Sequence, residues 1–245
     1  MNRDIIIVHT SDLHVDHDYT AKLHGGDGTA GLACVLNASR NIGADVVLLV
    51  GDTFDSHRVP DHVLDRAANV ISEAGLPVVL LPGNHDPALP EAIYRRGLLA
   101  QVGNLHVLGV THSEAVEFPD LDLEVWGRPH LDYGDMVPFE AVRPRRTRWQ
   151  VAVAHGHYDP KADRSISPRA SWLINDEELV ATGADYVALG HWNRAVRVGS
   201  VAAYYSGSPE YAGTVNVVRL TATGEVVVNQ HELDIPREVE PVFVP

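Results

Sequence analysis

Short runs of Val, Ile and Leu alternate with longer segments of helical periodicity in the first third of the chain. The runs Ile5–His9, Val46–Val50 and Val78–Leu81 predict strands, and the segments between them, Gly31–Ile42 and Pro60–Ala74, predict helices. The proline suits a helix start. This β-α-β-α-β order implies parallel strands with right-handed crossovers, and the continuous apolar runs indicate strands that are covered on both faces.

After Gly97 the predicted strands are separated by longer loops, and the end of the chain is rich in strands. Turns are expected at Gly207-Ser208-Pro209 and at Thr223-Gly224. The predicted strands are Leu105–Leu108, Leu123–Trp126, Gln150–Ala154, Tyr186–Leu189, Ala202–Tyr205, Thr214–Leu220 and Val226–Leu233. Together with the first third, these elements predict an α/β fold, a mixed two-sheet β sandwich flanked by helices.

Length and composition favour one domain. With 245 residues and 45% hydrophobic content, we expect residues 1–245 to form a single domain without a separate capping domain. The apolar run at Ile5–Val8 is far shorter than a signal-peptide core or a membrane span, so we expect a cytosolic protein with no membrane association. Cys34 is the only cysteine, which excludes an intramolecular disulfide, and we predict that it fills space in the core.

The charge balance is strongly acidic. The formal net charge is −14, with Lys+Arg 19 against Asp+Glu 33, and this excess disfavours unaided binding to the phosphate backbone of a nucleic acid. Pro138–Arg148 is a short basic run that contains Arg143, Arg145, Arg146 and Arg148. Charge runs are usually solvated, so we expect this one to be an exposed loop.

Polar clusters follow five of the predicted strands. The clusters are Asp12-Leu13-His14, Gly51-Asp52-Thr53-Phe54-Asp55, Gly83-Asn84-His85-Asp86, His155-Gly156-His157 and Gly190-His191-Trp192-Asn193. The carboxyl ends of the strands in an open α/β sheet form the crevice where ligands bind, so five such ends can converge on one site. Asp, Asn and His together predict a metal site, and their number favours two metals.

The first two clusters supply carboxylates. Asp12 and His14 are two residues apart, which in extended chain points both side chains the same way, so they can chelate one ion. Asp52 follows Gly51, whose flexibility allows a tight exit from the strand. The Asp52 carboxylate can bridge two cations.

The other three clusters supply amide and imidazole groups. Asn84 offers a carbonyl oxygen, while His85, one residue on, must point elsewhere and is free to act on a substrate. His155 and His191 each follow an apolar strand, and neutral imidazoles suit borderline divalent metals. His157 replaces His155 in this scheme only if its strand ends later than predicted. Three histidines lie outside these clusters and are expected to be ordinary surface or supporting residues; they are His17, His24 and His57.

This order of motifs resembles the calcineurin-like metallophosphoesterases, and the resemblance covers nearly the whole chain. Asp-Leu-His, Gly-Asp-Thr-Phe-Asp and the later segment Tyr205-Ser206-Gly207-Ser208-Pro209 are most similar to the SbcD-type exonuclease branch of that superfamily. The resemblance implies that Asp12 and His14 hold a first metal and that Asp52 bridges both metals. The residues it implies for the second metal are Asn84, His155 and His191.

The resemblance also implies the chemistry. His85 donates to the phosphate or to the leaving oxygen, and a hydroxide between two divalent cations attacks phosphorus in line. The expected ions are two Mn²⁺, with Mg²⁺, Fe or Zn²⁺ as alternatives. One position departs from the family, which usually has a second histidine where this chain has Asn193. An amide oxygen is a harder and weaker ligand, so the first metal should be held less tightly or should favour Mn²⁺ or Mg²⁺.

We therefore expect a phosphodiesterase or phosphatase that acts on a small or flexible phosphoester. A DNA nuclease of the SbcD type is the alternative within the family, and the acidic charge disfavours it. A non-catalytic metal-binding scaffold is an alternative of another class, for which Asn193 would mark lost activity. His85 argues against a scaffold, since a scaffold has no need of a histidine directed at a substrate. The sequence leaves the natural substrate and the oligomeric state open.

Overall fold

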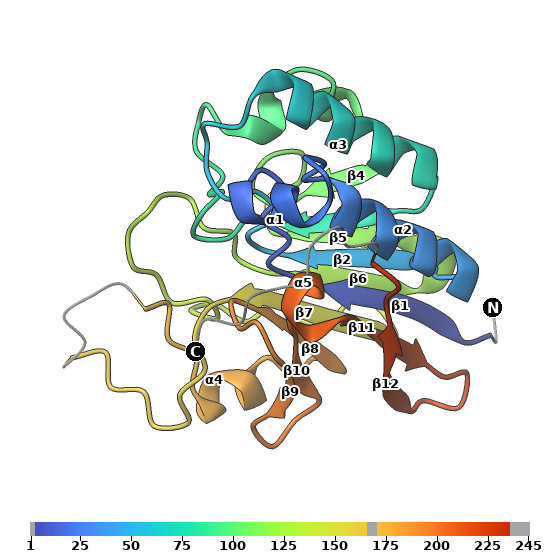
Figure 1. Cartoon of the computed structure of the whole chain (residues 1–245). Helices are drawn as coiled ribbons and strands as arrows, with labels where there is room; N and C mark the ends of the chain where they lie inside the picture. Colours follow the sequence, from blue (N-terminus) through green and yellow to red (C-terminus); the bar gives the residue numbers. More distant parts are fainter. Residues whose placement is uncertain (1–2, 166–170, 236–245) are drawn as a thin grey trace.

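The computed structural model describes residues 3–165 and 171–235, and within them two six-stranded sheets pack face to face (Figure 1). The first sheet has the spatial order β12 (Val226–Glu232), β11 (Thr214–Leu220), β1 (Ile5–Thr10), β2 (Val46–Val50), β3 (Val78–Leu81), β4 (Leu105–Val107). The second has the order β5 (Ala115–Phe118), β6 (Leu123–Trp126), β7 (Trp149–His155), β8 (Tyr186–Gly190), β10 (Ala203–Ser206), β9 (Ala195–Val198). The predicted α/β two-sheet sandwich is confirmed.

The middle of each sheet is parallel. Strands β1 to β4 pair in parallel, as do β6, β7, β8 and β10, whereas β5, β9, β11 and β12 pair antiparallel at the outer positions. Parallel neighbours end on the same side of a sheet. The carboxyl ends of the central strands of each sheet are therefore brought to one edge.

Alternating side chains of these strands divide the core into layers. Ile7 and Leu48 point between the sheets, where they pack with Val151, whereas Val47 and Leu49 point to the outer face of the first sheet. Period-two alternation produces this division because successive side chains of a strand point to opposite faces. Both faces of β2 are consequently buried, as its uninterrupted apolar run predicts.

Helices cover both outer faces. Helices α2 (Ala30–Ile42) and α3 (Asp61–Ala74) pack on the first sheet, and α4 (Asp176–Ala181) lies on the opposite side of the sandwich (Figure 1). Helix α2 is capped by Gly43, which has a φ of 73°, a left-handed conformation that glycine adopts without strain. The remaining helices are α1 (Asp18–Leu23), α5 (Pro209–Ala212) and the 3₁₀ turns Ile93–Arg95, Leu99–Gln101 and Pro119–Leu121.

Most predicted element boundaries lie within one or two residues of the observed ones, and the differences have local causes. Pro60 precedes α3 as its N-cap and is not its first helical residue. Pro209 begins α5 where only a turn was predicted. The elements absent from the prediction are short, and β9 is an outer strand with exposed residues. These elements are α1, α4, α5, β5, β9 and the three 3₁₀ turns.

The prediction for Cys34 was wrong: this residue is half-buried on α2 and does not fill the core, and its thiol donates to the Asp234 carbonyl oxygen at 3.4 Å. The basic run lies in a largely exposed loop, as predicted. Within it, Arg143 forms an ion pair with the fully buried Glu124, and Arg145 forms one with Asp185 at 2.7 Å. Among the described residues, no helix combines the length and apolar character needed to cross a membrane.

Candidate metal centre

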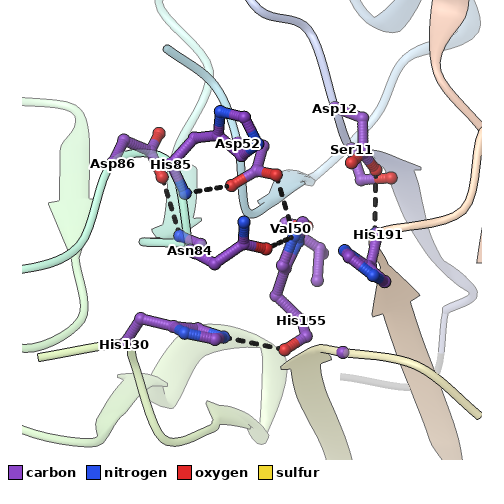
Figure 2. A network of polar contacts seen from close by, with 12 residues as sticks. Ser11, Asp12, Val50, Asp52, Asn84, His85, Asp86, His130, His155 and His191 are labelled. Atoms are coloured by element: carbon purple, nitrogen blue, oxygen red, sulfur yellow. Dashed lines mark hydrogen bonds and ion pairs between the residues drawn. The ribbon is translucent and has the colours of Figure 1, made fainter. Parts of the chain in front are cut away.

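The loops that follow β1, β2, β3, β7 and β8 meet at one edge of the sandwich, where their polar side chains form a cluster (Figure 2). The described residues form three groups of potential ligands, of which two share Asp52 and the third consists of His14, Asp55 and His85. Asp12, His14 and Asp52 offer ligand atoms within 4.8 Å of one another, and Asp52, His155 and His191 do the same. Asp52 thus lies between two candidate cation positions.

Unusual backbone conformations are concentrated in these loops. Among the described residues, six non-glycine residues have positive φ, and four of them belong to the cluster: Asp12 (55°), His14 (44°), Asp52 (50°) and His191 (104°). The expectation that extended chain orients Asp12 and His14 was therefore wrong. Left-handed conformations of this kind carry strain that the surrounding structure must offset.

Backbone hydrogen bonds hold the strained turns in place. The Asp12 N–H donates to the Gly51 carbonyl oxygen at 3.0 Å, and the His14 N–H donates to the Asp52 carbonyl oxygen at 3.1 Å. Leu13 between them is buried in the core beneath α2. The turn thereby directs its polar residues to the cluster and its apolar residue inward.

Glycine is required where site side chains pack against the backbone. A Cβ atom on Gly51 would lie 2.0 Å from Nδ1 of His155, and one on Gly83 would lie 2.3 Å from Oδ1 of Asp52. Gly51 also has a φ of 82°. Any larger residue at these positions would displace His155 or Asp52.

Hydrogen bonds orient Asp52 and His155. The His85 N–H donates to Oδ1 of Asp52 at 2.9 Å, and Oδ2 of Asp52 lies 3.1 Å from Nε2 of His155. Nδ1 of His155 is 2.9 Å from the Val50 carbonyl oxygen, and a carbonyl only accepts, so Nδ1 carries a proton. Nε2 is then the atom that faces Asp52 and the Asn84 amide oxygen, 3.1 Å away.

The same edge holds the other predicted ligands. The Asp12 carboxylate accepts from the His191 N–H at 2.9 Å, and the His191 ring lies 5.3 Å from that of His155. His157, the alternative to His155, is exposed and accepts from the indole N–H of Trp192 at 3.0 Å. Strand β7 ends at His155, one residue later than predicted, and so stops short of His157.

Burial and charge act against each other at the cluster. Burial raises the pKa of the Asp52 carboxyl, but the charge of His155 and its hydrogen bond outweigh burial, so the pKa lies below its usual range. Burial lowers the pKa of His155, but Asp52 raises it to about 10. Burial also raises the pKa of Asp12, and burial together with the charge of His155 lowers the pKa of His191 to about 4.

The donor set fits divalent cations. Carboxylate and amide oxygens suit hard ions, and imidazole nitrogens suit borderline ones; the donors are Asp12, His14, Asp52, Asn84, His155 and His191. An imidazole must be neutral to bind a metal, so cation binding at this edge is expected to release a proton and to weaken as the pH falls.

Asp55 is a functional candidate that the sequence analysis did not single out. Its Oδ1 atom lies 2.8 Å from Nδ1 of His14 and 3.5 Å from Nδ1 of His85. Its carbonyl oxygen accepts from Nδ1 of His85 at 3.0 Å. Asp55 therefore fixes both rings with Nε2 directed away from it. The second aspartate of Gly51-Asp52-Thr53-Phe54-Asp55 was the available signal.

Asp86 anchors the loop that carries Asn84 and His85. Its carboxylate accepts from the N–H groups of Phe54 and Gly83 and from the Tyr94 hydroxyl, at 3.0, 2.7 and 2.5 Å. Burial and the charge of Asp52 raise the pKa of Asp86 to about 6. His130 is a second buried support, with Nε2 2.9 Å from the His155 carbonyl oxygen (Figure 2).

The remaining sequence candidates lie beside the cluster. Asn193 is exposed and lines a cavity together with Asp12, His14 and His17. His17 also accepts from the Tyr19 N–H at the start of α1. The expectation for His24 was wrong in part, because it is buried and lies 2.8 Å from Glu210. His57 is half-buried and packs against Tyr133.

Comparison with known proteins agrees with this geometry. The family model of calcineurin-like phosphoesterases matches residues 5–194. The SbcD subunit of the SbcCD nuclease from Escherichia coli strain K12, and its counterpart from Escherichia coli O157:H7, are each 25% identical over 240 residues, which cover 83% of this chain. The chain spans 60% of the length of these relatives.

Solved structures share the fold. TT1561 of Thermus thermophilus matches with a TM-score of 0.59 at 12% identity, covering 93% of this chain and 98% of that one. A second crystal structure matches with a TM-score of 0.58 at 13% identity, covering 93% of this chain and 99% of the other. At these identities the likeness extends to the fold alone.

Proposed function

The chain belongs to the calcineurin-like phosphoesterase family and is a metal-dependent hydrolase of phosphoesters, and from that premise we propose that it acts as a phosphodiesterase or phosphatase with a dinuclear metal centre. The observation that carries this proposal is the position of Asp52, which belongs to two of the three groups of potential ligands. A carboxylate has two oxygens, so one residue can hold two cations.

The proposed ligands divide between two cations. Asp12 and His14, with Asn193 as a further oxygen donor, hold the first, and Asp52 bridges to the second. The second is held by Asn84, His155 and His191. When bound, such cations acidify water to a hydroxide nucleophile and neutralise charge on the phosphoryl oxygens. Mn²⁺ is the proposed ion, because oxygen and imidazole donors are mixed here.

His85 is proposed to act on the substrate and not on a metal. Its Nδ1 donates to the Asp55 carbonyl oxygen, and its side chain is 44% exposed, so Nε2 is the atom available outside the cluster. A protonated Nε2 can donate to a phosphoryl oxygen or to the leaving oxygen.

A DNA nuclease is the second candidate, and the match to the SbcD subunit of the SbcCD nuclease favours it. The net charge of −14 argues for a small or flexible phosphoester instead, since duplex binding depends on Lys and Arg at the phosphates. The scaffold alternative does not fit the family to which the chain belongs.

The test is hydrolysis of bis(p-nitrophenyl) phosphate and p-nitrophenyl phosphate with added Mn²⁺, Mg²⁺ or Zn²⁺, next to linear single-stranded and duplex DNA. We expect turnover of at least one small ester that is lost with chelator and restored by Mn²⁺. Cleavage of DNA without turnover of either small ester would favour the nuclease. Absence of metal-dependent turnover on every substrate would contradict the proposal.

A further inference from the structure

A small cavity opens beside the proposed first metal position, between α1 and α5. Its volume is about 160 Å³. Asp12 and His14 form the wall that it shares with the metal centre, and Asn193 stands at the same border. Tyr19 of α1 and Tyr211 of α5 line the other side. A group attached to a phosphate at the metal centre therefore has this cavity within reach.

The wall formed by Glu210 is held rigidly. Its carboxylate lies 2.8 Å from Nε2 of His24 at the end of α1, and the two side chains are only 5% and 2% exposed. A Cβ atom on Gly31 of α2 would lie 2.8 Å from the same carboxylate, so glycine permits the close approach. Three helices thus fix one buried carboxylate against the cavity.

Tyr19 and Tyr211 are more exposed than the buried Glu210, which also lines the cavity. Tyr211 is 54% exposed on the four-residue helix α5, and Tyr19 is half-buried on α1. Exposed aromatic side chains beside a phosphate site offer faces on which a flat ring can stack. The amide of Asn193 and the phenol hydroxyls add hydrogen-bonding groups at the rim.

The charge of the lining selects the chemical class of the occupant. Among the described residues, no Lys or Arg lines the cavity. Three acidic residues do line it: Asp12, Asp55 and Glu210. Such a wall repels a second phosphate and favours groups that donate hydrogen bonds. Its volume suits one ring system and not a length of polymer.

We propose that this cavity is the specificity subsite of the enzyme and that it binds a flat, hydrogen-bond-donating ring carried by the group that is esterified to the scissile phosphate, such as a nucleobase on its sugar. Tyr211 supplies the stacking face, and Glu210 accepts from the ring or sugar. The inference rests on the proposed function, because it places the phosphate at the metal centre. It assigns roles to Tyr19, Tyr211 and Glu210, which hold no metal.

The test uses two chromogenic esters with one leaving group, the p-nitrophenyl esters of deoxyadenosine 5′-phosphate and of methyl phosphate, with added Mn²⁺. The readout is the ratio of their kcat/KM values. We expect the wild-type chain to prefer the nucleoside ester and Tyr211→Ala to lower the ratio about tenfold, the usual effect of removing one stacking face. Tyr211→Phe keeps the aromatic face and should retain most of the preference.

Tyr133→Ala is the matched control, because Tyr133 is 56% exposed and does not line the cavity. It should leave the ratio as in the wild type. If Tyr133→Ala lowers the ratio as much as Tyr211→Ala, or if Tyr211→Ala leaves it unchanged, the subsite is refuted while the proposed function stands. A wild-type chain that hydrolyses neither ester contradicts the proposed function, and the subsite falls with it.

Discussion

The layer between the two sheets and the carboxyl edge of the same strands are built in opposite ways. Between the sheets, Ile7, Leu48 and Val151 are fully buried apolar side chains on regular strands. A few residues further along these strands, Asp52 and His155 are equally buried but ionisable, and Asp52 has a positive φ. Burial of apolar side chains therefore stabilises the fold between the sheets, whereas burial at the carboxyl edge disfavours the charged forms of the ionisable groups.

This contrast shows where the strain of the site is offset. Regular parallel ladders end immediately before the strained residues, as β2 does at Val50 before Gly51 and Asp52. Left-handed non-glycine residues cost on the order of 1–3 kcal/mol each. Burial of apolar surface between the sheets contributes roughly 25 cal/mol per Å² to the free energy of folding. This contribution offsets the strain of the turns at the carboxyl edge.

The largest effect is expected where the edge depends on one charge. Asp52→Asn keeps the size and the acceptor oxygen for the His85 N–H but removes the charge that faces both cation positions. We predict loss of detectable hydrolysis with an unchanged fold, measured by turnover of bis(p-nitrophenyl) phosphate and by circular dichroism. Asp61→Asn, which removes an exposed carboxylate paired with Arg96, is the control and should keep activity. Near-normal turnover and metal content in Asp52→Asn would refute the bridge.

A smaller loss is expected from the half-exposed part of the edge. His85→Ala should lower turnover by roughly 10²–10⁴-fold, the usual span for a positioned proton donor. Metal content should remain nearly intact, because the proposed ligands are untouched. Metal analysis after gel filtration separates the two effects, and His62→Ala on the exposed face of α3 is the control. Loss of metal from His85→Ala would show that His85 is a ligand.

The free energy of unfolding should depend on pH through His9, which lies between the buried layer and the carboxyl edge. His9 is buried on β1 with Nδ1 2.9 Å from the Tyr186 hydroxyl oxygen, and burial lowers its pKa from 6.5 to about 3. In the unfolded chain the pKa is about 6.5. Between these values the unfolded state binds a proton that the folded state does not, so the free energy of unfolding falls as the pH falls below 6.5.

The slope for one such group is roughly 1.4 kcal/mol per pH unit. We predict that His9→Gln loses less stability than the wild type between pH 7 and pH 5, measured by urea unfolding with chelator so that metal release does not contribute. Equal slopes in the two proteins would mean that His9 is not the group that titrates.

The smallest effect is expected at Asn193, the position where the chain departs from the pattern of the family. Asn193→His should tighten the first metal position and shift its preference toward Zn²⁺, by on the order of tenfold in affinity. Activity need not rise, since a tighter metal can retain product phosphate. Calorimetric titration with Mn²⁺ and Zn²⁺ measures both quantities, with Asn229→His on the exposed face of β12 as the control. Identical affinities in Asn193→His and the wild type would show that residue 193 does not reach the metal.

Strand positions and strand ends could be predicted because they depend on local pattern. The apolar run of β2 and the Asp that follows it are contiguous in sequence, and parallel pairing then brings the ends together. Seven ligands were predicted from these strand ends and from the family resemblance, and the structure gathers six of them at one edge and places Asn193 at the border of that cluster.

What could not be predicted depends on tertiary contacts. The left-handed turn at Asp12 exists because its N–H reaches the Gly51 carbonyl oxygen, a partner 39 residues away. Asp86 acquires its role only when Tyr94 and Phe54 meet its carboxylate. Helix α5 is too short to show a periodicity of its own.

The central claim is that Asp52 joins two cation positions in one site. Titration of the chain with Mn²⁺, followed by electron paramagnetic resonance, measures both the number of bound ions and their spin coupling. We predict two ions per wild-type chain with a coupled spectrum, and loss of the coupling in Asp52→Asn. A single bound ion per wild-type chain, or two ions whose uncoupled spectra are the same in Asp52→Asn, would contradict this account.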